Sequence, residues 1–553
     1  MISIINIDVI DIGVNNMYVN ILYPENERKL FTDREDVLRK LNYALSDVKK
    51  GAFRGFVILG VRRCGKTMIL KHFLFELLSD SSVIPIYVDF EGMPRDFNIM
   101  LDRLIGWIIF WIKTRGIGDP VEYGSPSILI RKLGRDDALL DSVLKFISLT
   151  DPDLKFRSIL SIINSLDKPV VLILDEIQDF LITAQEAKID VLGIMREMLR
   201  SKTLLVLSGS IRSIMYKVSM DSKERYFLQL ETIEIQPFGL KDTWELTEKI
   251  LGENISGATA AKILRLTGGF PFYIYVITNR ARELSELYQI GFDEALDIAY
   301  LQETYSRSGI IYEHCRYLWS EYLGYARRKR YLRSILEDLI TGPKKISEIA
   351  KNVGIDYNTV YIYMEELEKL GIVKRDNNTY YIFNPVFARW IAIRKELPEI
   401  LRIHPEDKGI ITQLKKLEKR VSRAERIASH TFEMLTQRII AELLGTTIEA
   451  RKLGETKLNK VKIPDKIIFN PTIKKENKIY EVDAILENDQ RWVVEITLSK
   501  IDRKYIQETK NIWKADIYWF ITYQGYTKSA KNNIENNEIL TDKKHLEKLL
   551  KGI

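Results

Sequence analysis

The stretch Gly60–Thr67 constrains the fold of this chain more than any other part of the sequence. It reads Gly-Val-Arg-Arg-Cys-Gly-Lys-Thr and fits the pattern G-x-x-x-x-G-K-[ST]. The apolar residues 56–59 before it predict a buried strand, and the apolar spacing over 68–78 predicts a helix. Between a strand and a helix, a glycine-bounded loop of this kind surrounds phosphate groups with its backbone N–H groups. The sequence therefore predicts a P-loop that binds ATP.

Each residue of this P-loop has an expected part in ATP binding. Lys66 is expected to reach the β- and γ-phosphates, and the Thr67 hydroxyl is expected to bind Mg²⁺. The nucleotide-binding residues predicted from the loop are Gly60, Val61, Arg62, Arg63, Cys64, Gly65, Lys66, Thr67 and Met68.

Two further apolar strands end in polar residues that suit the same site. The strand 170–174 is followed by Asp175, which suits a Mg²⁺ ligand, and by Glu176, which suits the base that orients the attacking water. The strand 204–207 is followed by Ser208 and Ser210. These serines either sense the γ-phosphate or form a simple turn.

The alternation of strands and helices over 29–240 predicts an α/β fold with a parallel sheet. Its expected strands are 55–59, 84–90, 170–174, 204–208 and 232–236. The predicted domains are a strand-rich lead-in (1–28), the P-loop core (29–240), a helical lid (241–329), a winged helix-turn-helix (330–395), a helical connector (396–430) and a C-terminal α/β domain (431–553).

Composition narrows the class of protein. Hydrophobic residues make up 46% and charged residues 29%, which are globular values. The two cysteines, Cys64 and Cys315, form no disulfide framework, and we expect a reducing cytoplasm.

The N-terminus lacks the features of a signal peptide. The apolar run 105–112 is far shorter than the roughly 20 residues of a membrane span, so it predicts a buried helix.

The net charge of +7 is concentrated near the C-terminus. Residues 401–553 contain 30 Lys and Arg against 22 Asp and Glu, a balance of +8. Such a region either binds an acidic partner such as DNA or forms a solvated lysine-rich surface.

Residues 346–383 have the pattern of a winged helix-turn-helix. Gly354 is expected to form the turn, Asp356 to cap the second helix, and 372–383 to form a hairpin. The second helix would present Tyr357, Asn358, Thr359 and Tyr361 to a major groove, and the wing would bring Lys374 and Arg375 to phosphate. Packing against protein is the alternative, because Glu365, Glu366 and Glu368 make the end of this helix acidic.

Taken in order, the segments 31–35 (FTDRE), 60–67, 172–180 (LILDEIQDF), 207–210 (LSGS) and 267–271 (TGGFP) resemble the archaeal ATPase family, a STAND-type branch of the AAA+-like P-loop ATPases. The resemblance implies that Phe31 and Arg34 lie near the adenine, and that a lid carrying Pro271 closes on the nucleotide. Arg225 would be an arginine finger on a neighbouring copy, or alternatively a surface salt-bridge residue.

Two carboxylates come together on a predicted hairpin of the C-terminal domain. Asp483 lies on the expected strand 479–486 and Glu495 on the strand 491–497, and a bound divalent cation is the usual reason for such a pair. The order of elements is similar to the PD-(D/E)XK nuclease-like fold. That resemblance implies Mg²⁺ or Mn²⁺ held by Asp483 and Glu495, with Glu433 as an accessory acid.

The lysine expected two positions after the second acid is replaced by Thr497. Either Lys500 or Lys504 takes its role, or the domain binds nucleic acid without cutting it, or the acidic hairpin is purely structural.

Three functions follow from these patterns. The first is an ATPase that acts on DNA through its winged helix and basic C-terminal domain. The second is a STAND-type switch whose output is formation of a homo-oligomer or binding of a protein partner. The third is a metal-dependent nuclease regulated by ATP. None of the three involves a membrane.

Overall fold

The structure is a computed structural model that describes residues 18–135, 137–209, 230–325, 328–376, 379–394, 403–404, 406–425, 432–469, 471–475, 478–497, 500–522 and 525–552. The chain divides into two compact units. The first unit contains Met1–Gln236 and Glu365–Ile372, and the second contains Pro237–Met364 and Val373–Ile553.

The described strands of the first unit form a five-stranded parallel sheet in the order β2-β3-β4-β1-β5. The strands are β1 (Phe53–Leu59), β2 (Ile84–Asp89), β3 (Val170–Asp175), β4 (Thr203–Gly209) and β5 (Leu230–Glu234). These are the predicted strands, with β5 beginning and ending two residues earlier, so the predicted α/β class is confirmed. Because the strands are parallel, their carboxyl ends meet at one edge of the sheet.

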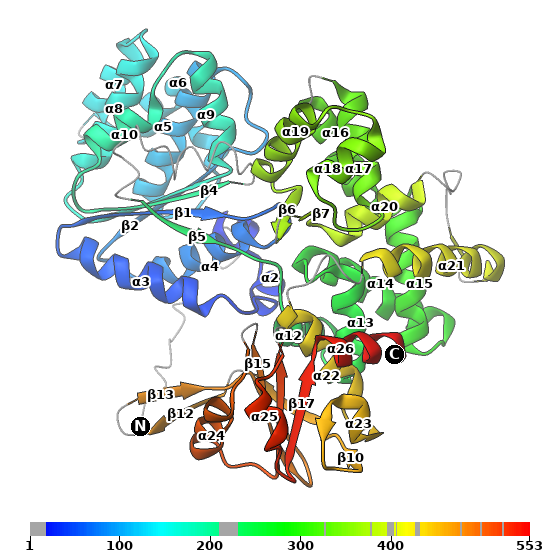
Figure 1. The fold of residues 1–553 in the computed structure, drawn as a ribbon. Helices are drawn as coiled ribbons and strands as arrows, with labels where there is room; N and C mark the ends of the chain where they lie inside the picture. Colours follow the sequence, from blue (N-terminus) through cyan, green and yellow to red (C-terminus); the bar gives the residue numbers. More distant parts are fainter. Residues whose placement is uncertain are drawn as a thin grey trace. The chain divides into compact units, whose positions relative to one another are not determined.

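Helices cover both faces of this sheet (Figure 1). One face carries α3 (Glu35–Lys49) and α4 (Lys66–Leu78), and the other carries α5 (Phe97–Thr114), α8 (Pro152–Asn164), α9 (Ile177–Glu186) and α10 (Val191–Met198). A 3-10 turn (Pro120–Tyr123), α6 (Pro126–Lys132) and α7 (Leu140–Ser148) complete the layer beside α5. The apolar run 105–112 lies inside α5, where Ile109, Phe110 and Trp111 are buried, as the sequence predicts.

The prediction of strands in residues 1–28 is wrong for the part that the structure describes. Residues 18–29 form two short helices, α1 (Tyr18–Leu22) and α2 (Glu25–Lys29). The apolar residues Val19 and Tyr23 are spaced four apart and both are buried, which suits one face of a helix rather than a strand. Residues 1–17 lie outside the described residues.

Beyond Gln236 the chain forms helices and then a winged helix, of which Glu365–Ile372 belongs to the first unit. The first helices are α12 (Leu240–Leu251), α13 (Gly257–Thr267), α14 (Pro271–Tyr288), α15 (Phe292–Tyr305) and α16 (Ile310–Tyr325). The winged helix has α17 (Lys329–Leu339), α18 (Ile346–Val353), α19 (Tyr357–Lys369), the hairpin β6 (Val373–Asp376) and β7 (Thr379–Ile382), and α20 (Pro385–Arg394). Gly354 ends α18 in the left-handed conformation, and the Asp356 side chain accepts from Thr359 N, both as predicted.

Beyond α21 (Lys408–Glu425), the chain forms a mixed sheet in the order β11-β14-β15-β16-β17-β9. Its strands are β9 (Glu455–Thr456), β11 (Lys466–Phe469), β14 (Ala484–Glu487), β15 (Arg491–Thr497), β16 (Ile517–Thr522) and β17 (Glu538–Asp542). The sheet has α22 (Phe432–Leu443), α23 (Ala450–Leu453) and α26 (Lys543–Gly552) on one face, and α24 (Arg503–Ile512) and α25 (Lys528–Asn532) on the other. Two small antiparallel pairs, β8 (Thr447–Glu449) with β10 (Lys460–Lys462) and β12 (Thr472–Lys475) with β13 (Lys478–Glu481), lie outside it.

The predicted continuous strand 479–486 is interrupted. Residues 478–481 form β13 and pair with β12, whereas 484–487 form β14 and pair with β11 and β15. At the break, Val482 N donates to Pro471 O, and the Asp483 side chain accepts from Ile496 N at 2.6 Å. The break therefore takes Asp483 out of the strand and turns its carboxylate to the backbone of β15.

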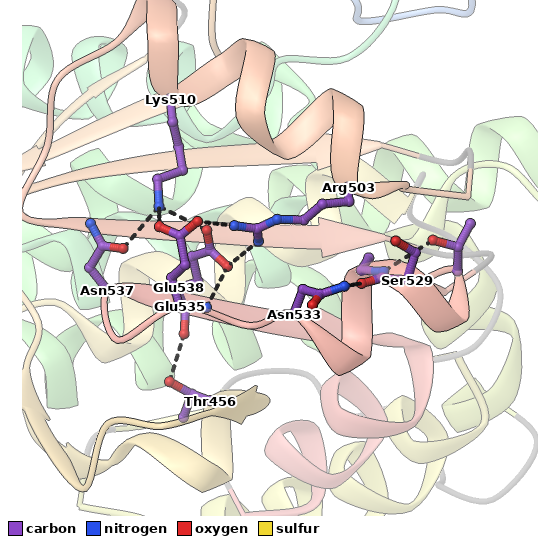
Figure 2. Close-up of polar contacts among 10 residues, drawn as sticks. Thr456, Arg503, Lys510, Ser529, Asn533, Glu535, Asn537 and Glu538 are labelled. Carbon is purple, nitrogen blue, oxygen red and sulfur yellow. Dashed lines mark hydrogen bonds and ion pairs between the residues drawn. The ribbon is translucent and has the colours of Figure 1, made fainter.

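Helix α24 is fixed to the start of β17 by a cluster of charged side chains (Figure 2). Glu538 is fully buried and accepts from Arg503 Nη1 at 2.7 Å and from Lys510 Nζ at 2.8 Å. Glu535 bonds to the same two cations, and Asn537 accepts from Lys510 at 3.0 Å. The charged cluster therefore holds α24 against the sheet at the start of β17.

Candidate nucleotide site and C-terminal acidic pair

The P-loop has the backbone conformation that a phosphate-binding turn requires. It joins β1 to α4, and Gly65 lies directly before the helix with φ at 91°. This left-handed conformation is readily available to glycine and costly for other residues. Arg63 also has a positive φ of 70°, so the loop curls sharply before α4 begins. The predicted strand–loop–helix setting is therefore present.

Lys66 points into the P-loop. Its side chain is almost fully buried, and its Nζ donates to Gly60 O at 3.0 Å and to Val61 O at 3.3 Å. The ammonium group thus lies against the backbone of the loop that is expected to surround the phosphates. Of the other predicted loop residues, Cys64 is buried, Arg63 is exposed, and Val61, Arg62 and Met68 are half-buried.

Asp175 is the centre of a buried polar cluster at the carboxyl edge of the sheet. One carboxylate oxygen accepts from Ser208 Oγ at 2.7 Å, and the other accepts from Tyr87 Oη at 3.1 Å. Burial raises the pKa of Asp175, and hydrogen bonds from Ser208 and Thr67 only partly oppose that shift. The structure therefore brings Thr67, Asp175 and Ser208 together, as their places at strand ends predict.

Glu176 occupies a strained backbone position beside this cluster. Its φ is 48°, in the left-handed region, and it is the N-cap residue of α9. Its carboxylate accepts a hydrogen bond from Gln178 Nε2, and its side chain is half-buried. Strain in a non-glycine residue is typical of functional sites, where the surrounding structure fixes a side chain in a particular direction.

Asp89 belongs to the same acidic edge and was not predicted from the sequence. It ends β2 and is the cross-strand partner of Asp175 in the register of the sheet. Burial, followed by the charge of Asp175, raises the pKa of Asp89 to about 7. The available signal was an acid at the end of the predicted strand 84–90, but an isolated acid at a strand end is too common to single out.

Of the two predicted adenine-side residues, Phe31 packs on the P-loop helix and Arg34 bonds to the end of the first unit. The Phe31 ring stacks on His72 of α4, with ring centroids 3.8 Å apart and planes inclined by 11°. Arg34 is the N-cap residue of α3, and its guanidinium donates to Gln236 O at 2.5 Å. The segment 31–35 is thus joined both to α4 and to the end of the first unit.

Pro271, the predicted lid residue, lies in the second unit, at the start of α14. The residues just before it, Gly269 and Phe270, form a corner of the lid, and this lid corner is tightly packed against the winged helix. Phe238 N donates to Gly269 O at 2.7 Å, and the Phe270 ring contacts Phe383, which follows β7, at a centroid distance of 6.1 Å.

Arg389 of α20 completes the same corner. It is 1% exposed and donates to Arg265 O at 2.9 Å, to Leu266 O at 3.0 Å and to Pro385 O at 3.1 Å. The lid corner and the helix that follows the wing are therefore one packed body.

The helix predicted to contact DNA exposes aromatic residues. Tyr357 is 52% exposed and Tyr361 42% exposed on α19. In the wing, Lys374 Nζ lies 4.0 Å from the centroid of Phe383, and the Arg375 guanidinium lies 5.8 Å from that of Tyr380. These contacts hold the two wing cations against aromatic rings.

The C-terminal acids also come together. Ala484 pairs with Val494, so Asp483, which directly precedes β14, lies beside Glu495 of β15. The Asp483 carboxylate accepts from Ile496 N, and the Glu495 carboxylate accepts from the hydroxyl of Tyr505 on α24. Burial raises the pKa of Tyr505, and the hydrogen bond to Glu495 and the charge of Asp483 raise it further.

Tyr505 is a residue that the sequence did not indicate. Its contact with Glu495 depends on how α24 lies over β15, and no local pattern encodes this. Thr497 lies two residues beyond Glu495 on β15, as predicted, and Lys500 is exposed in the segment before α24.

Three predicted site residues lie wholly or partly outside the residues that the structure describes. Ser210 and Arg225 lie outside the described residues. Glu433 lies at the start of α22, where its side chain is not among those described. Within the described part of the chain, no group of three or more His, Cys, Asp or Glu side chains forms a metal cluster. The helices in that part are also too short or too polar to cross a membrane.

Two family descriptions match this chain. Residues 31–277 match an ATPase domain predominantly from Archaea, and residues 335–389 match the sugar-specific transcriptional regulator TrmB. No curated protein matches the chain.

Several solved structures are similar. The Walker-type ATPase of Pyrococcus abyssi is 17% identical, with 65% of this chain and 96% of that chain covered and a TM-score of 0.45. The Thermotoga maritima RuvB Holliday junction branch migration motor is 16% identical, with 65% and 95% covered and a TM-score of 0.32. The Aeropyrum pernix ORC2 protein is 14% identical, with 71% and 93% covered and a TM-score of 0.38.

The P-loop, the acidic strand end and the family match agree with one another. The P-loop and the acidic strand end lie within residues 31–277, which are similar to the archaeal ATPase domain, and the winged helix lies within residues 335–389, which are similar to TrmB.

Proposed function

We propose that this protein hydrolyses ATP at the carboxyl edge of the first-unit sheet and that the bound nucleotide changes its contacts with DNA. The observation that carries the proposal is the convergence of Lys66, Thr67, Asp175, Glu176 and Ser208 at that edge. Each has the side chain that its role requires, and each is held by backbone or buried side-chain contacts.

The residues at this edge fit a magnesium nucleotide. A hydroxyl and a carboxylate are oxygen ligands of the kind that Mg²⁺ prefers, and Thr67 and Asp175 are already in hydrogen-bond contact. The buried Asp175 carboxylate would be costly without a cation. When bound, Mg²⁺ would neutralise charge on the phosphates.

The chain's own residues then divide the remaining roles. Lys66 places a positive charge within the loop, where the β- and γ-phosphates would bind. Glu176 orients the attacking water, with its carboxylate directed by Gln178 and by its strained backbone. Ser208 Oγ is hydrogen-bonded to Asp175, so a shift of that carboxylate would move the end of β4.

Transmission to the winged helix is supported by the packing of the second unit. If Pro271 and the lid follow the nucleotide, then Phe383 and α20 must move with them, because Arg389 and Phe270 join them in one body. A change of nucleotide would thus reposition the wing that carries Lys374 and Arg375.

DNA contact is supported by the TrmB-like match, the exposed side of α19, and the positive charge of residues 401–553. Phosphate contacts release counterions, so they make affinity strongly dependent on salt. We assign Lys374 and Arg375 to the DNA backbone.

The C-terminal domain is proposed to hold a divalent cation with Asp483 and Glu495. Two adjacent carboxylates oriented by Ile496 N and Tyr505 fit the donor set of Mg²⁺ or Mn²⁺, with water as the remaining ligands. A cation there would polarise a phosphodiester group of bound DNA.

The test is DNA affinity measured by fluorescence anisotropy with a duplex at several salt concentrations, in the presence of ATP and of ADP. We expect affinity to fall steeply with salt and to differ at least about fivefold between the two nucleotides. Replacing both Lys374 and Arg375 by Ala should lower the salt slope by about 2. The exposed pair Lys329 and Arg330 on α17 is the matched control. Absence of any DNA binding at low salt would contradict the proposal.

A further inference from the structure

Two helices of the C-terminal domain expose a group of cations on one side of the sheet. Helix α23 exposes Arg451 and Lys452, and helix α26 exposes Lys544 and Lys548. None of these four side chains forms an ion pair with any residue that the structure describes. We call these four side chains the basic face.

The two helices meet at the end of β17, which brings their cations to the same region. Thr541 Oγ1 donates to Leu453 O at 2.7 Å, and this bond lies next to Lys452 and three residues before Lys544. Helix α23 packs against α26. The apolar residues of both helices are buried in one core cluster, which contains Ala450, Leu453, Leu546 and Leu549. The basic face therefore lies on the outer side of a single packed layer.

The lysines of α26 occupy positions where a helix disfavours positive charge. The first turn of α26 contains no acid and includes Lys544, beside backbone N–H groups that already form a positive dipole end. Lys544 and Lys548 are four residues apart, a spacing at which like charges destabilise a helix. The nearby Asp542 carboxylate is used otherwise, because it accepts from Lys544 N at 3.1 Å and from His545 Nδ1 at 2.8 Å. Local preference thus gives no reason for this charge, which indicates a functional one.

The opposite side of the same sheet pairs its helical cations with acids. On α24, Arg503 and Lys510 both bond to the buried Glu538 (Figure 2). Lys504 Nζ lies 3.8 Å from a carboxylate oxygen of Glu508 on the same helix. The basic face differs from α24 in that a partner must supply its negative charge.

The phosphate backbone of DNA fits the basic face. Lysine and arginine bind phosphates by charge and release the counterions of the nucleic acid. Lys544 and Lys548 are about 6 Å apart along the helix axis, so both can reach one backbone. Arg451 adds a planar guanidinium, which can donate two parallel hydrogen bonds to a phosphate. Contacts of this kind hold a protein on DNA and carry no base preference.

We propose that the basic face is a second DNA-contact surface of this protein, which binds the phosphate backbone without sequence preference. This inference rests on the DNA contact of the proposed function. It adds that the C-terminal domain contacts DNA through α23 and α26, on the side of its sheet opposite to α24, in addition to the contacts of the wing.

The test is fluorescence anisotropy of the full chain with duplexes of unrelated sequence over a range of salt concentrations. The first variant combines Lys544→Gln with Lys548→Gln, and a second adds Arg451→Gln and Lys452→Gln. The matched control combines Lys514→Gln with Lys528→Gln, two exposed lysines beside α24 and in α25. The first variant and the control each remove two positive charges, so a difference between them reports the place of the charge. Thermal midpoints show whether each variant keeps its fold.

We expect the salt slope of DNA affinity to fall by about 2 in the first variant and by about 4 in the second. The control should keep the wild-type slope, and all duplexes should be affected equally. If the wild-type protein binds DNA but both variants keep its slope, or if the control lowers the slope as much as the first variant, the inference is overturned. Loss of binding to phosphatidylserine vesicles with unchanged DNA affinity would overturn it in favour of a lipid surface. If the wild-type protein binds no DNA at low salt, the proposed function itself fails.

Discussion

Substituting Gly269 by Ala tests how tightly the lid corner is built. Gly269 has φ at 74°, and a Cβ there would lie 2.1 Å from Phe238 O and 3.1 Å from Phe238 C. Since real Cβ atoms do not approach closer than 3.0 Å, the backbone must move by almost 1 Å. The movement would break the 2.7 Å bond from Phe238 N to Gly269 O.

The expected free-energy cost of Gly269→Ala has three parts. The left-handed backbone costs a non-glycine residue about 1–2 kcal/mol, the lost hydrogen bond about 1 kcal/mol, and the residual crowding about 1–2 kcal/mol. Gly252 supplies a matched control, because it has the same φ of 74° with no atom within 4 Å of its added Cβ. Gly252→Ala should therefore cost only the first part, and the difference of about 2–3 kcal/mol isolates the close approach to Phe238.

The assay is hydrogen exchange, which reports local opening in a protein of several units better than a single melting temperature does. Relative to wild type, the opening equilibrium of residues 257–288 in Gly269→Ala should rise roughly 30- to 150-fold more than the opening equilibrium of α12 rises in Gly252→Ala. ATP turnover should also fall in Gly269→Ala, since the distorted corner carries Pro271. Equal exchange in the two variants would refute the reasoning, because it would mean that the backbone yields without cost.

Two further predictions concern buried charge. The pKa of Asp89, about 7 in the folded protein, lies above its unfolded value, so the folded protein binds the extra proton and the stability of the nucleotide-free protein should fall as pH rises from about 4 to 7. Asp89→Asn should flatten that dependence in urea unfolding followed across this window, and an unchanged slope would contradict it. Arg389→Met should cost about 3 kcal/mol or more, because it leaves the carbonyl groups of Arg265 and Leu266 unsatisfied in the core. Arg389→Met should also reduce the difference in DNA affinity between the ATP-bound and ADP-bound protein. If hydrogen exchange at 257–270 is faster but that difference in affinity is unchanged, the proposed coupling between the lid and the wing is contradicted.

The parts of the fold that sequence predicted best are those with strong local signals. The buried strands 170–174 and 204–208 are continuous apolar runs, and the P-loop pattern fixes a strand before it and a helix after it. Asp175 and Glu176 followed directly from the end of a strand. The boundaries between the six predicted domains stay predictions.

Features that depend on distant contacts escaped prediction. The break at Val482 and Asp483 lies inside an apolar stretch that has strand propensity throughout, and only the contacts with Pro471 and Ile496 reveal it. Tyr505 and Glu495 meet because α24 packs on β15, and Arg389 acts on carbonyl groups more than 120 residues away. Asp89 gained its significance from the register between β2 and β3.

The most direct test of the central claim is single-site chemistry at Glu176. Glu176→Gln keeps the size of the side chain and its contact with Gln178 but removes the charge that orients water. We predict that binding of a fluorescent ATP analogue stays within about threefold of wild type, while ATP turnover falls at least about 100-fold. Glu91→Gln, which removes an exposed carboxylate near the same edge, should leave turnover near wild type. Turnover within tenfold of wild type in Glu176→Gln would contradict the account.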